Sequence, residues 1–526
     1  MQLCSQLAEP APLLQTDLLL GLGLAQRQAG IPAFRETLLE AGGAAIGSGA
    51  TDRLVRAALA NNRGFGSLGV VDTDRVEVLE AALEAAGDGD SPARALLLAA
   101  LCNELTYGPL ERRRVLADEA RAIARRLGEP ETLVRVLYTV HLTALCVPET
   151  LEERLSDSAE ALEGAEALGD PVHVFWAAAA VRAAALQDGD FATAAGCMAT
   201  MSAVSERLRE PTMLWTTRFH HAADALLAGD AARAEEVAAV ALQLGTDSGQ
   251  PDAFAFYGGQ LIWSRVQSGR VGELVPLVAD SVTQNPGVAG FHAALAMAHL
   301  HAGEAAEGSR LLEEAATAGF ERLSVDIAWT IAVVMYALAA IELEAEGPAA
   351  QLTALLVPYH GQVAFQGAIS QDALAVYLGG LSAVLGRYDD AERYFAEAAD
   401  LHERGGMVYG QAQTDLLWGT MLAARGLPAD SARARAMLER ARAVAGERGY
   451  AMIESRAAAM LGRAARLSAS GGSPPDSGPA GRSRRPVQCG RPRRTAPSVS
   501  QEPTPPGYRV GPTGARPAQG RSDRAS

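Results

Sequence analysis

The feature that most constrains this chain is a period of about forty residues, marked by turn-forming residues between apolar segments. Most intervals between these residues are 39 to 41 residues long, with one of 34 and one of 44. The turn residues are Gly30, Gly69, Gly108, Pro148, Gly189, Gly229, Gly269, Gly303, Gly347, Gly386 and Gly426. A single helical hairpin cannot bury its apolar face alone, so this period predicts hairpins that stack into one continuous core.

The composition supports helices rather than strands. Hydrophobic residues make up 48% of the chain and aromatic residues only 5%, and the abundant Ala and Leu have high helix propensity. A compact protein of 526 residues would need several domains, whereas a solenoid grows by adding repeats. We therefore expect an all-α fold, with residues 1–467 forming a right-handed superhelix of about eleven helical hairpins.

The clearest repeat lies between Asp372 and Glu403. Its first half, Ala373 to Leu385, has apolar residues at helical spacing, and Gly386 begins the turn. In the second half, the small Ala391 and Ala398 allow two helices to approach closely, and Phe395 fills the space between them.

These residues resemble a tetratricopeptide repeat (TPR). The resemblance rests on Leu378-Gly379, Gly386, Tyr388, Ala391, Phe395 and Ala398. A second period agrees with the first, because prolines expected at helix starts recur at Pro130, Pro171, Pro211 and Pro251. Gly128 and Gly169 are expected to end the helices that precede two of these prolines.

The apolar periodicity stops near residue 467. Residues 468–526 are rich in Gly, Pro, Ser and Arg, and we expect a disordered tail there. The tail has ten Arg and only three acidic residues although the whole chain carries a net charge of −16, so the body is strongly acidic. An acidic body is not expected to bind nucleic acid or an anionic membrane directly. The tail could also be an out-of-frame translation, and the chain a truncated gene fragment without independent function.

The amino-terminal half resembles the helical region of large actinobacterial regulators of the LuxR-type and AfsR-like kind. The resemblance rests on the order of short segments: 61–65, Val71-Asp72, Arg75-Val76, 104–107, 112–114 and 122–128. In that family a P-loop ATPase precedes a TPR-like array, often with a DNA-binding domain at one end. The resemblance implies that this chain is only the middle module, which senses a ligand or partner for an ATPase or DNA-binding domain.

The residue types exclude several chemistries. The chain contains no Lys, which removes Schiff-base chemistry and the P-loop phosphate site. No GxSxG nucleophile motif or CxxC pair is present, and the pairs His220-His221 and His299-x-His301 lack the spacing that places two metal ligands on one helix face. We therefore predict no enzyme activity, no catalytic residue, no cofactor and no metal site.

Localisation is predicted from the absence of two signals. No convincing secretory signal is present, and the longest apolar stretch, Ile327–Ile341, is shorter than the roughly 20 residues that span a bilayer. The sequence therefore predicts a cytoplasmic protein.

Aromatic residues recur shortly after the periodic prolines. The candidates for a groove that binds a partner or ligand are Trp176, Trp215, Phe256 and Tyr257, because aromatic side chains gain contact area at low entropic cost. The alternative is that they belong to the core between repeats. Similarly, Arg112–Arg114 is expected to form a solvated helix face, with contact to an anion or partner as the alternative.

The leading functional hypothesis is a non-catalytic protein-interaction and sensing module of a signal-transducing transcriptional regulator. The alternative is a solenoid that binds a small-molecule inducer, such as a sugar or metabolite, in its concave groove.

Overall fold

The computed structural model describes residues 12–62, 71–250, 252–284, 288–320, 323, 325–367 and 369–470. These residues belong to one compact unit that ends at Ser470. The expected disordered tail lies almost entirely outside them, as do the predicted turn at Gly69 and the helix start at Pro251. Within the described part of the chain, every helix is too short or too polar to span a bilayer.

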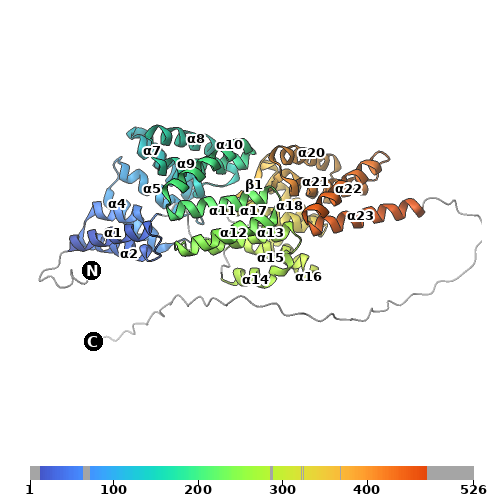
Figure 1. The fold of residues 1–526 in the computed structure, drawn as a ribbon, viewed down its shortest axis with the longest axis horizontal. Helices are drawn as coiled ribbons and strands as arrows, with labels where there is room; N and C mark the ends of the chain where they lie inside the picture. The colour runs from blue at the N-terminus through green and yellow to red at the C-terminus, as the bar shows by residue number, and fades with distance from the viewer. Residues whose placement is uncertain are drawn as a thin grey trace, which may run out of the picture. The chain divides into compact units, whose positions relative to one another are not determined.

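The chain folds into helical hairpins that follow one another in sequence order (Figure 1). Ten hairpins of the described chain pair α1 (Pro12–Gln28) with α2 (Phe34–Ser48), α3 (Thr51–Ala60) with α4 (Thr73–Ala86), α5 (Pro92–Glu104) with α6 (Leu110–Leu127), α7 (Pro130–Thr139) with α8 (Leu151–Leu168), α9 (Pro171–Asp188) with α10 (Phe191–Leu208), α11 (Pro211–Leu227) with α12 (Ala231–Asp247), α15 (Ala289–His301) with α16 (Ala305–Thr317), α17 (Trp329–Glu342) with α18 (Glu346–Leu356), α19 (Leu374–Val384) with α20 (Tyr388–Gly405), and α21 (Val408–Arg425) with α22 (Asp430–Arg448). In the seventh hairpin, between those of α11 and α15, α13 (Ala253–Gln267) contacts the short segment η4 (Val271–Leu274), which leads into α14 (Val275–Gln284). The helix α23 (Ala451–Ser470) follows the last hairpin, and the other short irregular segments are η2 (Val140–Ala144), η3 (Pro148–Thr150) and η5 (Val357–Tyr359). The predicted solenoid of helical hairpins is confirmed.

Local sequence explains where these helices begin and end. Pro130, Pro171 and Pro211 each occupy the first position of a helix, where the missing N–H costs nothing. At the hairpin turns, Gly189 and Gly229 have φ values of 80° and 78°, a left-handed conformation that favours glycine.

One predicted turn glycine is misplaced. Gly347 is the second residue of α18, so it lies within the first turn of that helix. The left-handed residue of this connection is Glu344, with a φ of 50°, and the turn therefore comes three residues earlier than the period predicts.

The all-α prediction misses a small β-hairpin. The strands β1 (Val363–Gln366) and β2 (Ile369–Ala373) pair antiparallel, and they occupy the segment just before α19. Asp372 and Ala373, which the period assigned to the start of the repeat, therefore belong to a strand. Contacts with α9, α11 and α17 bury both strands, so tertiary packing overrides the local helical period here.

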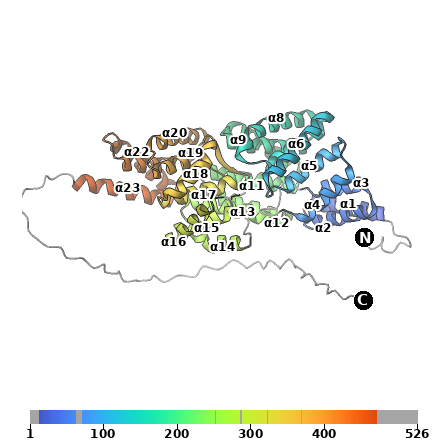
Figure 2. The same cartoon turned by 180° about the vertical axis from the view of Figure 1, so that it is seen from behind.

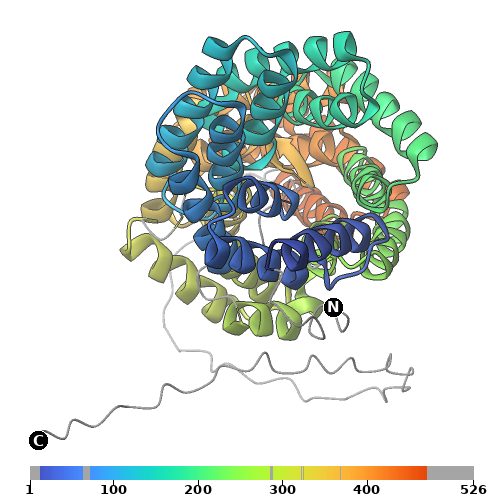
Figure 3. The same ribbon diagram turned by 90° about the vertical axis from the view of Figure 1, so that its left-hand side faces the viewer.

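The hairpins wind around an axis (Figure 3). Seen along this axis, the chain runs clockwise as it recedes from blue through green to orange, which makes the superhelix right-handed. From the front and from behind, the first hairpins lie toward one end of the unit and α19–α23 toward the other (Figures 1 and 2).

Successive turns of the superhelix are in direct contact. Arg113 donates to the carbonyl of Val325, Arg404 to that of Gly189 and Tyr450 to that of Gly229, across separations of 212, 215 and 221 residues. These separations equal about five and a half forty-residue repeats, so each superhelical turn contains between five and six hairpins. The structure is thus a superhelix whose neighbouring turns share a core.

The contacts between turns correct the expected role of Arg113. Arg112 and Arg114 are half-exposed and pair with Glu80 and Glu149, as a solvated face requires. Arg113 on the same helix is buried and also donates to the carbonyl of Ala144. Burial lowers the pKa of its guanidinium group. Sequence spacing alone cannot reveal this, because the helix face that carries Arg113 is covered by the next superhelical turn.

The hydrogen bond from Tyr450 to Gly229 yields a first prediction. The Tyr450 hydroxyl is buried and lies 2.7 Å from the Gly229 carbonyl oxygen. Tyr450→Phe removes this donor and leaves a buried carbonyl short of a partner, so we expect a loss of about 1–3 kcal/mol in the free energy of unfolding. Urea denaturation measures it, and the half-exposed Tyr388→Phe on α20 provides the control. Equal stability of both variants would contradict the contact between turns.

Candidate functional site

The inner face of the superhelix is formed by the first helices of the hairpins. In α9 nearly every residue from Ala177 to Gln187 is buried, and in α17 every residue from Trp329 to Ala340 is buried. A helix that is apolar on all sides must be covered on all sides. The second helices, such as α20, instead alternate buried and exposed positions and face outward.

The β-hairpin lies against these inner helices. β1 contacts α9 and α17, whereas β2 contacts α11 and α13. In Figure 3 the hairpin stands near the middle of the ring of helices. It therefore brings residues of the second superhelical turn against the inner face of the first.

A cavity of about 110 Å³ lies where the β-hairpin meets the inner helices. Its wall combines residues of α9, α11, α13, α15 and α17 with both strands and with the segments after α5 and α7. Most of these side chains are apolar, and no described residue that lines the cavity carries a formal charge. The polar lining residues are Thr106, Tyr107, Thr143, His220, Gln366 and Gln371.

His220 lines the cavity as a neutral ring. Burial, together with the charge of nearby Arg182, lowers its pKa well below the usual value. Arg182 Nη1 lies 3.0 Å from His220 Nδ1. Because a guanidinium can only donate, Nδ1 is the acceptor and the single ring proton resides on Nε2.

Gln371 is held at the cavity by an irregularity in the β-hairpin. Val363 pairs with Ala373 and Phe365 with Ser370, which leaves Gln371 and Asp372 opposite the single residue Ala364. This two-against-one pairing is a β-bulge, a feature that re-aims side chains and is common beside functional sites. Gln371 is 1% exposed, and neither its Oε1 nor its Nε2 has a hydrogen-bond partner.

The four aromatic residues predicted to form a groove do not share one surface. Trp215 is 2% exposed and packs edge-on against Phe219 and Phe256, with ring centroids 5.0 and 5.1 Å away. Phe256 lines the cavity. Tyr257 packs against a small apolar cluster of Ala222, Val237 and Ala238.

Trp176 lies in a second pocket of about 260 Å³. This pocket also contains Arg135, Tyr138 and His173, and Leu142 borders both pockets. The structure thus brings Trp215 and Phe256 together, places Trp176 in the neighbouring pocket, and keeps Tyr257 apart.

Sequence reasoning missed Gln371 and His220. Gln371 carries no local signal, because it lies at the edge of a repeat, in a strand that the helical period does not predict. His220 was considered only as a metal ligand, and its position at the cavity depends on the hairpin that folds back from the second turn.

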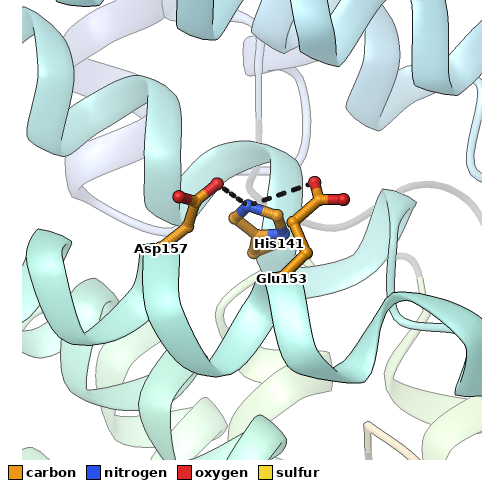
Figure 4. A group of neighbouring side chains, drawn as sticks. All are labelled: His141, Glu153 and Asp157. Carbon is orange, nitrogen blue, oxygen red and sulfur yellow. Dashed lines mark hydrogen bonds and ion pairs between the residues drawn. The ribbon is translucent and has the colours of Figure 1, made fainter.

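A second polar cluster lies where the connection of the fourth hairpin meets its second helix, and it joins His141, Glu153 and Asp157 (Figure 4). His141 belongs to the π-helical segment η2, and the two acids belong to α8. His141 Nε2 lies 2.8 Å from an oxygen of Asp157 and 4.0 Å from one of Glu153. Their ligand atoms are close enough to hold a metal ion.

Arginines already supply the positive charge at this cluster. Arg121 bonds to both Glu153 and Asp157, and Arg125 lies 2.9 Å from Asp157. Burial alone would raise the pKa of Asp157, but hydrogen bonds from His141 and Arg121 hold it well below the usual value. A metal ion would have to displace a guanidinium, so we interpret the cluster as an ion-pair network that ties α6, η2 and α8 together.

The network predicts acid-sensitive stability. Because the pKa of Asp157 is depressed in the folded state, its stabilising contribution is complete above the usual carboxyl range and is lost as pH falls below about 4. Asp157→Asn is therefore expected to lower the free energy of unfolding at pH 7 by about 3 kcal/mol, since it breaks a buried ion pair. Denaturant melts from pH 3 to pH 7 measure both effects.

Glu160→Gln, one turn further along α8, is the matched control. Glu160 is half-exposed and also pairs with Arg125, so the control should cost less than about 1 kcal/mol. If both variants cost the same, the buried network does not contribute as described.

Comparisons with known proteins identify no family for this chain. No family model matches the sequence, and a search of curated proteins finds no match. One solved structure, "Crystal structure of APC/C hetero-tetramer Cut9-Hcn1", is 13% identical with a TM-score of 0.49, covering 87% of this chain and 86% of that one. A second, "Circular tandem repeat protein with novel repeat topology and enhanced subunit contact surfaces", is also 13% identical with a TM-score of 0.13, covering 88% of this chain and all of the other.

The fold defines the class of this protein as a helical-repeat solenoid. That class follows from the hairpins and their stacking in the structure itself.

Proposed function

We propose that this chain is a non-catalytic sensing module of a signal-transducing transcriptional regulator, and that it senses a small molecule on its inner face. The observation that carries the proposal is the composition of the cavity wall. Tyr107 and Thr143 belong to the first superhelical turn, whereas Phe365 and Gln371 belong to the hairpin of the second. A molecule in the cavity therefore touches both turns at once.

Such an occupant can act on the whole superhelix. Small rotations between repeats add along a solenoid, so a change in the packing of two turns alters the positions of its ends. If two packings of the turns are in equilibrium, a ligand shifts that equilibrium only as far as its affinities for the two packings differ. A molecule that contacts both turns has this difference, because separating the turns removes its contacts with one of them.

The regulatory context of the proposal rests on the sequence resemblance to LuxR-type and AfsR-like regulators. Its partners would be a P-loop ATPase and a DNA-binding domain, both in the cytoplasm. The acidic body is suited to contacts with protein rather than nucleic acid.

The test is a thermal-shift screen with uncharged metabolites, followed by hydrogen exchange on each compound that binds. A ligand that binds only the native state at about a hundred times its Kd stabilises it by about 2.7 kcal/mol, which raises the melting temperature. We expect added protection in both β1–β2 and α11. Protection confined to a single hairpin, or no binder in a broad library, would contradict the proposal.

The second pocket favours a protein partner as another candidate. It places the half-buried Trp176 beside Arg135 and Tyr138, and Trp, Arg and Tyr are the residues that most often dominate protein interfaces. Trp176→Ala should abolish capture of a P-loop ATPase partner in a pull-down. Phe254→Ala, which removes an exposed aromatic from α13, should leave capture intact.

A further inference from the structure

Among the buried glutamines of the described chain, Gln371 is the one whose side-chain oxygen and nitrogen both lack a partner, whereas Gln267 and Gln413 each have one such atom. Gln260 donates to the carbonyl of Phe219 and Gln267 to that of Leu226, each at 2.7 Å. Gln371 is buried as deeply, yet both of its polar atoms lack partners. Leaving a buried donor and a buried acceptor unpaired is costly, and most buried polar groups avoid it.

The surrounding fold holds Gln371 in this unfavourable place. The bulge in β2 fixes its backbone, and the next residue, Asp372, is anchored by the Tyr377 hydroxyl at 3.4 Å. β2 packs against α11 and α13, so the side chain of Gln371 stays at the cavity. Its carboxamide therefore presents one donor and one acceptor to whatever enters the cavity it lines.

The other residues of the cavity wall disfavour a charged ligand. Phe219, Phe256 and Met335 supply apolar surface, and His220 adds the Nε2–H donor of a neutral ring. The positive charge of Arg182, behind His220, is already paired with Asp224. An ionised ligand would lose its hydration without gaining a counterion from the described wall.

The volume limits the size of the ligand. An apolar cavity of about 150 Å³ in another protein is known to admit benzene. At about 110 Å³ this cavity is smaller, so it holds a short branched chain, or one ring that extends into its opening to the outside.

We propose that the cavity binds a small, uncharged, mainly apolar molecule that carries a carboxamide or lactam group, whose donor and acceptor pair with the side chain of Gln371. This inference rests on the small-molecule sensing proposed above and specifies the ligand class of the same cavity. A carboxamide matches a carboxamide, because each offers one N–H and one C=O in the same plane. The bound ligand would satisfy both unpaired atoms at once.

The experiment compares three ring compounds of similar size on the full chain. Benzamide carries the proposed group, benzoate replaces it with a charge, and toluene has neither donor nor acceptor. Ligand-observed NMR and calorimetric titration measure binding to the wild type, to Gln371→Leu and to a control, Gln351→Leu. Gln351 is exposed on α18, so the control makes the same chemical change away from the cavity.

The wild type and the control should bind benzamide and toluene but not benzoate. Gln371→Leu should bind benzamide roughly tenfold or more weakly, because two hydrogen bonds are lost, while its affinity for toluene stays equal or rises. Gln371→Met, which keeps the length of the side chain, should behave in the same way and serves if the leucine variant does not fold. Circular dichroism verifies the fold of each variant.

The outcomes separate the two proposals. If toluene binds but benzamide gains nothing from Gln371, or if benzoate binds as well as benzamide, the ligand class is wrong although the cavity still accepts small molecules. If none of the three compounds binds to the wild type, the cavity is not a ligand site, and the proposed sensing function fails with it.

Discussion

Replacing Asp372 with asparagine is expected to stabilise the protein progressively as pH rises from about 4 to about 7. Asp372 is 3% exposed, and its carboxylate receives one hydrogen bond, from Tyr377 at 3.4 Å. The nearby ring of His402 is neutral, because burial lowers its pKa to about 3. Its Nε2 accepts from the Ala373 N–H, so the ring provides no positive charge.

The sign of the effect follows from the direction of the shift. Burial raises the pKa of Asp372 to about 7, so the folded protein keeps a proton that the unfolded chain releases near pH 4. The folded state is therefore favoured at low pH, and this contribution is lost as pH rises through about 7. This increase in the pKa of Asp372 corresponds to a difference of about 4 kcal/mol in the free energy of unfolding between the acidic and the alkaline end of the pH range.

Denaturant melts of the wild type and Asp372→Asn between pH 4 and pH 8.5 measure the difference. Asparagine is neutral at every pH in this range. The variant should therefore become more stable relative to the wild type as pH rises, and the difference in the free energy of unfolding should reach a plateau above pH 7. Asp400→Asn on α20 is the control, because Asp400 is exposed and should show no such trend. A constant difference across the range would show that the Asp372 carboxyl does not titrate there.

The second large effect is expected from Trp263→Ala. Trp263 lies on α13, in the seventh hairpin, and is 1% exposed. Its ring packs edge-on against Tyr409 of α21, in the eleventh hairpin, with centroids 5.9 Å apart. Truncating a buried Trp removes its apolar contacts and leaves a cavity, which costs about 3–5 kcal/mol.

The position of Trp263 makes the variant a test of cooperativity. Because the two hairpins share this contact, the loss should lower the stability of both, and hydrogen exchange should rise in α21 as well as in α13. Trp176→Ala, which alters a half-buried Trp at the second pocket, should cost less. Faster exchange confined to α13 would show that the two hairpins unfold independently.

Much of the fold is local and was predictable. Pro130, Pro171 and Pro211 start helices, and Gly128 and Gly169 end them in the left-handed conformation, because these effects depend on a few neighbouring residues. Phe395 was predicted to fill the space between the two helices of its hairpin. A Cβ built on Gly379 would come within 2.6 Å of the Phe395 ring, which explains why a Leu-Gly pair stands there.

The candidate site was much less predictable. The aromatic residues do recur at equivalent positions in adjacent repeats. The position of a residue within its repeat, however, does not determine which face of the helix another superhelical turn covers. Trp215 is consequently buried, whereas Trp176 lies at a pocket. Gln371 and the β-hairpin that holds it depend on contacts with α11 and α13, which precede them by about a hundred residues or more in the sequence.

The sequence by itself determined the hairpins, because helix periodicity, caps and turn residues act within one repeat of about forty residues. Only the tertiary structure decided how the turns meet, since their spacing is the sum of small rotations over five or six repeats. That sum brings Gly229 against Tyr450 and the β-hairpin against α11. The cavity forms where two stretches of chain that are distant in the sequence lie against each other. Their approach depends on the pitch of the superhelix, which no single repeat determines.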